Sequence, residues 1–326
     1  MKLKATTAAL ALTFAFGAGA AQACELDRSV KLADGNWDAV QVFNSIAAMI
    51  LEKGYDCEAE MVTGGMVPLF TALGKGDLDV FMDVWIPNNE EIWAETKAQG
   101  AVELGVMYDD ATEGWYVPRF VVEGDADRGI EAMAPDLKSV EDLAAHWELF
   151  QDPEEPGKGR FLNCPIGWGC EQRNNAKLEG YGLTETFVNF KPGTGAALDS
   201  AFAAAAKRGK PVVGYYWAPT WLLGVHDMVK LEEPACTETN ADACAFSNTP
   251  ASVTASAAFV EEADALESFF ANYKTSSAEV SAILAYMQEN EGSTREDAAK
   301  FFLENYQDTW TNWVPADVAE KVKASL

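Results

Sequence analysis

Residues 30–62 read VKLADGNWDAVQVFNSIAAMILEKGYDCEAEMV. Val30–Ala33 is a short apolar run that predicts a strand, and Glu58–Val62 predicts a second strand. Between them, Asp38–Lys53 places its apolar side chains on one helical face, and Gly54 ends that helix. Two neighbouring parallel strands joined by a helix are the repeating unit of an α/β fold.

The alternation of strands and helices continues along the chain. Further predicted elements are helices at Met66–Leu73, Asn88–Gln99, Glu171–Gly180 and Gly195–Arg208, strands at Leu78–Val84 and Pro211–Trp217, extended segments at Tyr116–Val122 and Ala251–Ala257, and helices opened by capping boxes at Ser139 with Asp142 and at Ser293 with Glu296. The last seventy residues are mostly helical. We expect residues 24–117 and 253–326 to form lobe 1 and residues 118–252 to form lobe 2, with two crossing strands as a hinge.

The N-terminus resembles a secretory signal peptide. Lys2 and Lys4 precede an apolar, alanine-rich run at 5–20, and Ala21-Gln22-Ala23 fits a small-x-small cleavage site. The apolar run is too short for a membrane span. We predict cleavage after Ala23 and a periplasmic mature protein, and Ala21 disfavours a lipoprotein signal at Cys24.

The six cysteines all lie after the predicted cleavage site, and an even number in an exported protein favours disulfides. Six cysteines allow 15 connectivities. Proximity in sequence suggests Cys164–Cys170, Cys236–Cys244 and then Cys24–Cys57. The alternative of a cysteine-based metal site has little support, because the sequence has no Cys-x-x-Cys motif. We assign no metal and no cofactor.

The charge balance excludes some partners. Without residues 1–23 the chain has 22 basic and 51 acidic residues, a formal charge of about −29. This charge opposes binding to nucleic acid or to an anionic membrane. About 300 mature residues are enough for a large core and for two domains.

Residues 164–171 read CPIGWGCE, with two cysteines that can close a small ring around Trp168. Gly167 and Gly169 lack a Cβ, so a ligand can approach the indole face and the backbone N–H groups. A helix beginning near Gly169 and Cys170 would direct its positive end at that ligand. The pattern suits a cationic head with a carboxylate tail. The alternative is a stapled surface turn whose Trp168 packs inward.

The positions of the ten tryptophans suggest an aromatic cage. Trp37 and Trp85 follow predicted strands, Trp217 ends one, and Trp168 opens a helix. Ligands of open parallel sheets bind beyond the carboxyl ends of the strands. We expect these indoles to line a cleft between two lobes and to bind a methylated onium cation, each contact contributing roughly 0.5–2 kcal/mol. Trp115 is a weaker candidate, and packing is assigned to Trp93, Trp147, Trp221, Trp310 and Trp313.

Three stretches together resemble a known family. They are Gly76-Asp77-Leu78-Asp79-Val80 leading to Val84-Trp85-Ile86-Pro87, then Cys164 to Glu171, and Tyr215-Tyr216-Trp217-Ala218-Pro219-Thr220-Trp221. The chain is similar in them to the periplasmic glycine betaine/proline betaine-binding proteins of ABC importers, the ProX-like and OpuAC-like group. The resemblance implies a type II periplasmic binding protein fold, with two α/β lobes, a two-strand hinge and the ligand cleft between the lobes.

The resemblance also implies roles for individual residues. Trp85, Trp168 and Trp217 would surround a trimethylammonium group, and Gly169 and Cys170 would hold the ligand carboxylate with backbone N–H groups. A Cys164–Cys170 disulfide is implied as well.

Two positions depart from the family pattern. A histidine is expected four residues after the first cage tryptophan, and this chain has Asn89, which can donate but carries no charge. Glu113 stands near the predicted crossover, where a neutral residue is expected. Glu113 either faces solvent or lies near the cage, where it would favour choline, or trimethylamine N-oxide if protonated. Trp37 is a possible fourth wall, and dimethylsulfoniopropionate would also fit such a cage.

We therefore expect a monomeric binding protein that closes its lobes on a small onium ligand and then meets a membrane permease driven by an ATPase. The rival class is a secreted hydrolase, but neither His146 nor His226 lies near a nucleophile elbow, and no Gly-x-Ser-x-Gly motif is present. A ligand-sensing module feeding a receptor would use the same pocket, and the sequence does not separate it from uptake.

Overall fold

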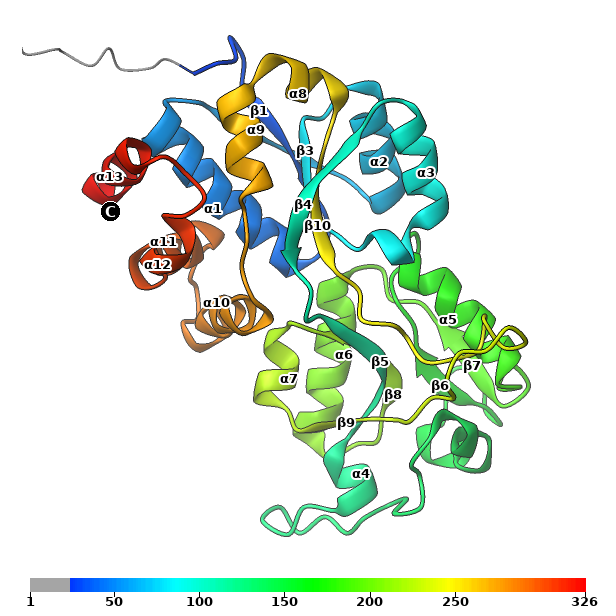
Figure 1. Cartoon of the computed structure of the whole chain (residues 1–326). Coiled ribbons are helices and arrows are strands. Elements are labelled where there is room, and N and C mark those ends of the chain that lie inside the picture. The colour runs from blue at the N-terminus through cyan, green and yellow to red at the C-terminus, as the bar shows by residue number, and fades with distance from the viewer. Residues whose placement is uncertain (1–23) are drawn as a thin grey trace, which may run out of the picture.

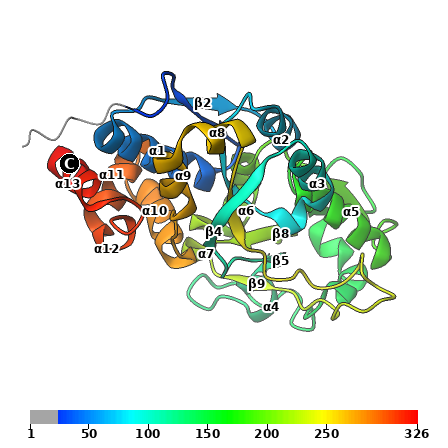
Figure 2. The same cartoon turned by 45° about the horizontal axis from the view of Figure 1, so that its top comes forward.

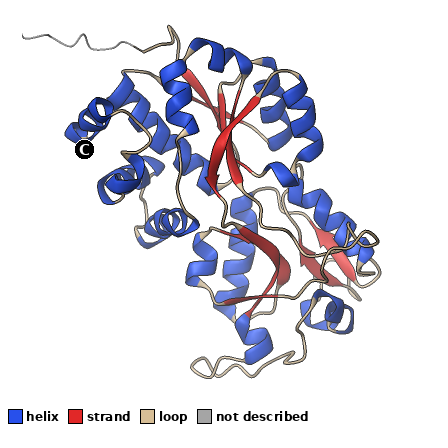
Figure 3. Cartoon of the chain, viewed as in Figure 1, coloured by secondary structure: helices blue, strands red, loops and turns tan. Residues whose placement is uncertain are grey.

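The computed structural model describes residues 24–326. The predicted signal peptide, 1–23, and its cleavage site lie outside the described residues. The chain builds two five-stranded sheets, one above the other, and each is flanked by helices (Figures 1 and 3).

The first sheet has the strand order β2-β1-β3-β10-β4. Its strands are β1 (Val30–Asp34), β2 (Ala59–Thr63), β3 (Val80–Val84), β4 (Val102–Tyr108) and β10 (Ala251–Ala255). β1 pairs in parallel with β2 and β3, whereas β10 runs antiparallel to β3 and β4. The predicted parallel unit of residues 30–62 is therefore present.

The second sheet has the order β7-β6-β8-β5-β9. Its strands are β5 (Thr112–Pro118), β6 (Gly159–Leu162), β7 (Phe187–Phe190), β8 (Val213–Ala218) and β9 (Met228–Lys230). β6 is parallel to β7 and β8, and β5 is antiparallel to β8 and β9.

Helices pack around both sheets (Figures 1 and 2). With the first sheet go α1 (Asp38–Tyr55), α2 (Met66–Lys75), the short helix η1 (Ile86–Asn88), α3 (Glu90–Ala98), α8 (Ala257–Glu262), α9 (Asp264–Ala271), α10 (Ser277–Glu289), α11 (Arg295–Asn305), α12 (Gln307–Trp310) and α13 (Ala316–Ser325). With the second go α4 (Arg119–Glu123), η2 (Val140–Ala145), η3 (Trp147–Phe150), α5 (Gly169–Gly180), α6 (Gly195–Arg208) and α7 (Trp221–Val225). No helix among residues 24–326 is both long and apolar enough to cross a membrane.

We call residues 24–108 and 251–326 lobe 1 and residues 112–230 lobe 2. The chain crosses between the sheets at 109–111 and again within 231–250. The first crossing comes earlier than predicted, because β5 begins at Thr112 and already pairs with β8. The predicted extended segment Tyr116–Val122 is only partly extended, since Arg119–Glu123 is helical.

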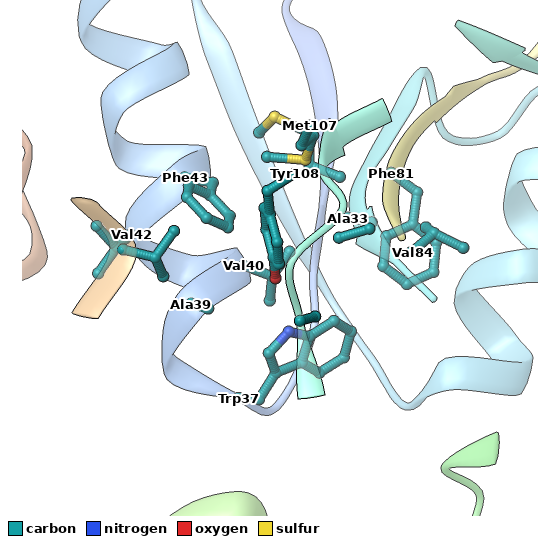
Figure 4. Packing of buried hydrophobic residues seen from close by; sticks show 14 of the residues in the cluster. Ala33, Trp37, Ala39, Val40, Val42, Phe43, Phe81, Val84, Met107 and Tyr108 are labelled. Carbon is teal, nitrogen blue, oxygen red and sulfur yellow. The ribbon is translucent and has the colours of Figure 1, made fainter. Parts of the chain in front are cut away.

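Local signals explain the main helix of lobe 1. α1 buries one apolar side, including Phe43, Ile46 and Ile50, against β1, and it ends at Asp56 in the left-handed region. Figure 4 shows Phe43 and Val40 of this helix packed beside Tyr108 of β4, with Trp37 at the edge of the cluster nearest lobe 2.

One capping prediction is wrong by a single residue. The helix α11 is capped by Thr294, whose hydroxyl accepts from the Asp297 N–H while the Asp297 carboxylate accepts from Thr294. The predicted pair, Ser293 with Glu296, has the same spacing one residue earlier. The capping box at Ser139 with Asp142 is present.

The described residues contain three disulfides, one in lobe 1, one in lobe 2 and one in the second crossing segment. They join Cys24 to Cys57, Cys164 to Cys170, and Cys236 to Cys244, the same pairs that proximity in sequence suggests. Because the Cys24 sulfur is bonded to Cys57, it is not free to carry a lipid.

Candidate functional site

A cavity with about 440 Å³ of empty space, part of it open to solvent, lies where the two lobes meet. Its aromatic wall contains Trp37 and Trp85 from lobe 1 and Trp168 and Trp217 from lobe 2. The structure thus brings together the four indoles that the sequence places near strand ends and at a helix start. The other lining residues are Met66, Asp83, Asn88, Asn89, Gly169, Cys170 and Tyr215.

The Trp168 indole meets two of the other three indoles edge to face rather than stacked. The ring centroids of Trp168 and Trp37 are 5.7 Å apart with an interplanar angle of 74°, and those of Trp168 and Trp217 are 5.5 Å apart with an angle of 75°. Edge-to-face rings leave their negative faces turned toward different sides of a common space. That arrangement can surround a cation of roughly spherical shape.

The folds of both lobes place these rings. Trp85 directly follows β3 and Trp37 comes shortly after β1, so both stand beyond the carboxyl ends of parallel strands. Trp217 lies near the end of β8, and Trp168 is the N-cap residue of α5. The site therefore occupies the position where ligands bind in open α/β sheets.

The Trp168 turn presents a helix N-terminus to the cavity. Gly169 and Cys170 begin α5, and both line the cavity. Among the described residues, no acceptor is hydrogen-bonded to either backbone N–H. Unsatisfied N–H groups in the first turn carry partial positive charge and suit an anionic group.

Gly169 is also a point of close approach between the two lobes. A Cβ at Gly169 would stand 2.0 Å from the carbonyl oxygen of Asn88 and 2.8 Å from Oδ1 of Asn89. Only a residue without a side chain fits between α5 and the turn after β3.

Asn89, expected to donate to the ligand, is already used in its own turn. Its Nδ2 donates a 2.8 Å hydrogen bond to the carbonyl oxygen of Trp85. Asn89 is buried and lines the cavity. The bond fixes the backbone that follows Trp85, so Asn89 holds the cage in place from within the cavity wall.

Of the two alternatives for Glu113, the structure excludes the one in which it faces solvent. Its side chain is buried, and it lies behind the cavity wall rather than in it. Nδ2 of Asn88 donates to both carboxylate oxygens at 3.0 and 3.1 Å, and the hydroxyls of Tyr215 and Thr249 donate at 2.6 and 3.1 Å. Burial raises the pKa of Glu113, and these donors together with the charge of Arg173 oppose that rise.

The Glu113 partners come from distant parts of the chain. Asn88 belongs to lobe 1, Tyr215 to lobe 2, and Thr249 to the second crossing segment. Arg173 of α5 donates to Oδ1 of Asn88. Glu113 therefore joins both lobes and the second crossing segment directly behind the cavity.

Asp83 is a charged cavity residue that the sequence analysis missed. It is 2 % exposed and lies within β3, which otherwise consists of apolar residues. Its carboxylate accepts from Nε1 of Trp37 at 2.7 Å, Nε1 of Trp85 at 3.1 Å and the hydroxyl of Tyr108 at 2.5 Å. A lone acid in a buried apolar strand directly before a cage tryptophan is the signal that could have identified it.

The other tryptophans are distributed partly as predicted. Trp115, the weaker cage candidate, is fully buried and donates to Asn174, so it belongs to the core of lobe 2 and not to the cage. Trp221 lines a small neighbouring cavity that Trp37 and Trp217 also line. Met66 and Tyr215 line the main cavity although the sequence analysis gave them no role.

Comparison with known families gives this arrangement a context. Residues 28–305 match the model of the family described as the substrate binding domain of the ABC-type glycine betaine transport system. The chain belongs to this family. Its members are transport binding domains and not enzymes, in agreement with the expected absence of catalysis.

Characterised relatives match over part of their length. The glycine betaine-binding periplasmic protein OusX of Dickeya dadantii is 29% identical over 170 residues, which cover 51% of this chain and 48% of that protein. The glycine betaine/proline betaine-binding periplasmic protein of Escherichia coli is 29% identical over 154 residues, covering 47% of this chain and 44% of that protein. The matched region thus spans about half the length of these relatives.

Solved structures of this family share the fold. ProX of Borrelia burgdorferi superposes with a TM-score of 0.73 at 17% identity, covering 90% of this chain and 100% of that chain. Lactococcal OpuAC, in its closed conformation complexed with glycine betaine, superposes with a TM-score of 0.70 at 19% identity, and the match covers 89% of this chain and 100% of that chain. An ABC-transporter choline binding protein in complex with choline superposes with a TM-score of 0.72 at 18% identity, and the match covers 91% of this chain and 97% of that chain. The fold is that of type II periplasmic binding proteins, as the resemblance implies.

Proposed function

We propose that this protein is the periplasmic substrate-binding protein of an ABC importer and captures a methylated onium solute of the glycine betaine class. The observation that carries the proposal is the single cavity lined by Trp37 and Trp85 from one lobe and Trp168 and Trp217 from the other. Membership of the glycine betaine transport family supports it.

The cage would bind the cationic head of the ligand. A quaternary ammonium group has no hydrogen to donate, so ring faces and not acceptors are its natural partners. Four indoles within one cavity allow several cation–π contacts at once, each contributing roughly 0.5–2 kcal/mol according to how completely water is removed.

The N-terminus of α5 would bind the carboxylate tail. The N–H groups of Gly169 and Cys170 border the same cavity as the rings. A zwitterion with one methylene between its charges can therefore touch the cage and the helix end together.

Lobe closure would complete the site. Each lobe supplies two of the four indoles, so an open form divides the cage, and a ligand that bridges the halves shifts the population toward the closed form. The closed lobes would then dock on a membrane permease powered by an ATPase. We expect a monomer that needs no cofactor.

Two acidic groups favour an alternative ligand of the same class. Asp83 lines the cavity and Glu113 lies directly behind it, and both would repel a ligand carboxylate. Choline and trimethylamine N-oxide carry no carboxylate, and so they are the alternatives. Dimethylsulfoniopropionate satisfies both the cage and the α5 terminus and belongs with glycine betaine.

Calorimetry with glycine betaine, choline, trimethylamine N-oxide, dimethylsulfoniopropionate and carnitine tests the proposal. We expect at least one of them to bind, and Trp168→Ala to abolish that binding while circular dichroism stays unchanged. Trp147→Ala is the matched control, because Trp147 is partly exposed and outside the cavity lining. Failure of all five compounds to bind, or turnover of any of them, would refute this function.

A further inference from the structure

Asp83 differs from the other buried acids of this protein. Among residues 24–326, five other buried carboxylates each have a basic side chain nearby: Asp34 with Arg295, Asp79 with Arg28, Asp152 with Arg160, Glu171 with Lys191, and Glu113 with Arg173. Within the same residues, no basic side chain forms an ion pair with Asp83. Its three partners, Trp37, Trp85 and Tyr108, are neutral donors.

A buried carboxylate without a counter-charge is costly, because burial removes its hydration and neutral donors replace only part of it. The cost is visible in its titration: burial raises the pKa of Asp83 to about 6, although all three hydrogen bonds act to lower it. The only titratable group among its partners is Tyr108, whose own pKa lies well above the usual value. The protein thus keeps a negative site that nothing within the described residues neutralises.

The same carboxylate also fixes two walls of the cage. Oδ2 accepts from the Trp37 indole and Oδ1 from the Trp85 indole, so one group sets the direction of both N–H bonds. The backbone of Asp83 has a φ of 56°, in the left-handed region that residues other than glycine, asparagine and aspartate rarely adopt. Figure 4 shows how the Tyr108 side chain extends toward Trp37 at this end of the core.

We propose that Asp83 makes the cage selective for a permanent positive charge, acting as the counter-charge of the bound onium group and as the positioning residue for Trp37 and Trp85. The inference rests on the proposed function and adds to it. Aromatic faces alone bind neutral apolar groups as well, whereas a buried carboxylate in the wall attracts a cationic trimethylammonium head and does not attract a neutral tert-butyl head of the same shape.

The test compares glycine betaine with its tert-butyl isostere, in which carbon replaces the quaternary nitrogen and the carboxylate is kept. Calorimetry near pH 7.5 should show that the wild-type protein prefers glycine betaine, and that Asp83→Asn weakens glycine betaine by more than about tenfold but the isostere by less than about threefold. Asp77→Asn removes the same charge from an exposed position of lobe 1, so it should change the affinity neither for glycine betaine nor for the isostere.

The outcomes separate the two proposals. If the wild-type protein binds no onium compound, the proposed function fails, and this inference fails with it. Equal affinity of the wild-type protein for both compounds, or equal weakening of both by Asp83→Asn, overturns this inference alone.

A wild-type measurement decides the case in which Asp83→Asn does not fold. A proton and an onium group would compete for Asp83, so affinity for glycine betaine should fall about fourfold from about pH 7.5 to about pH 5.5, given the pKa of about 6. Affinity for the isostere should not fall over the same range, because it has no cationic head to lose the attraction and its carboxylate is repelled less when Asp83 is protonated. An affinity for glycine betaine that is the same at both pH values contradicts the proposal.

Discussion

The indole Nε1 of Trp168, in lobe 2, donates a 2.8 Å hydrogen bond to Oδ1 of Asn36, in lobe 1. A wall of the candidate cage is thus tied across the cleft to the turn between β1 and α1. The same turn carries Trp37, whose ring meets the Trp168 ring edge to face. The contact makes the orientation of Trp168 depend on lobe closure.

Asn36→Ala should therefore weaken ligand binding without changing the fold. Loss of one hydrogen bond of about 0.5–1.5 kcal/mol predicts a dissociation constant that rises about 2- to 10-fold. Calorimetry with the best onium ligand measures the change. Asn290→Ala, at the exposed end of α10, is the control and should bind as the wild-type protein does. Unchanged affinity in Asn36→Ala would show that the contact does not contribute to closure.

Gly169→Ala should block closure. Its methyl group would meet the Asn88 carbonyl oxygen, which belongs to the other lobe, so the clash arises only when the lobes are together. Overpacking of about 1–3 kcal/mol predicts a loss of affinity of about 5- to 150-fold. Gly193→Ala is the matched control, because a Cβ there meets nothing within 4 Å.

Small-angle scattering adds a second readout to the Gly169 experiment. The wild-type protein and Gly193→Ala should become more compact when ligand is added, and Gly169→Ala should not. Compaction of Gly169→Ala with normal affinity would mean that the lobes close in another way.

Glu113→Gln should destabilise the protein. Asn88 donates to both carboxylate oxygens, so an amide in their place sets one N–H₂ group against another. An unsatisfied buried donor costs about 1–3 kcal/mol of unfolding free energy. Denaturant unfolding measures it, with Glu291→Gln at an exposed position as the control. Equal stability of the two variants would argue against Glu113 as the connection between the two lobes and the second crossing segment.

The stability of the ligand-free protein should depend on pH in a definite direction. Burial raises the pKa of Asp83 from 3.8 to about 6, so the folded state binds this proton more tightly than the unfolded state does. The stabilisation is complete below about pH 4 and is lost as pH rises through about 6, amounting to at most about 3 kcal/mol. Burial is also the main cause that raises the pKa of Asp199 to about 7. Asp199 therefore adds a further loss of unfolding free energy as the pH rises.

Denaturant unfolding between about pH 4.5 and 7.5 checks this prediction. The unfolding free energy of the wild-type protein should fall with pH over this window, and the fall should be smaller in Asp83→Asn. A slope that is the same in both proteins would show that Asp83 does not titrate there.

Features set by neighbours in sequence were predictable. Trp85 directly follows a strand and Trp168 opens a helix, and the cysteine pairs are those closest along the chain, so the local pattern was enough to predict where these residues lie. Local pattern fails where two registers are equally good: Ser293 with Glu296 and Thr294 with Asp297 have the same spacing, and packing of α11 selects the second.

The roles of Asp83 and Glu113 depend on partners distant in sequence. Asp83 meets Trp37 and Tyr108, and Glu113 meets Tyr215 and Thr249, only because the two sheets bring these segments together. Apart from the position of Asp83 in an apolar strand, nothing in a chain with 51 acidic residues distinguishes these two acids by their contacts. The sequence therefore predicted the four indoles that line the cavity but not the hydrogen bonds of the two carboxylates beside them.

A crystal structure of the protein with its tightest-binding onium compound tests the central claim most directly. We predict the methylated nitrogen within about 6 Å of the ring centroids of Trp37, Trp85, Trp168 and Trp217, with both lobes contributing contacts. Density for the ligand at any other place, or a cavity that stays empty while the lobes are closed, would contradict it.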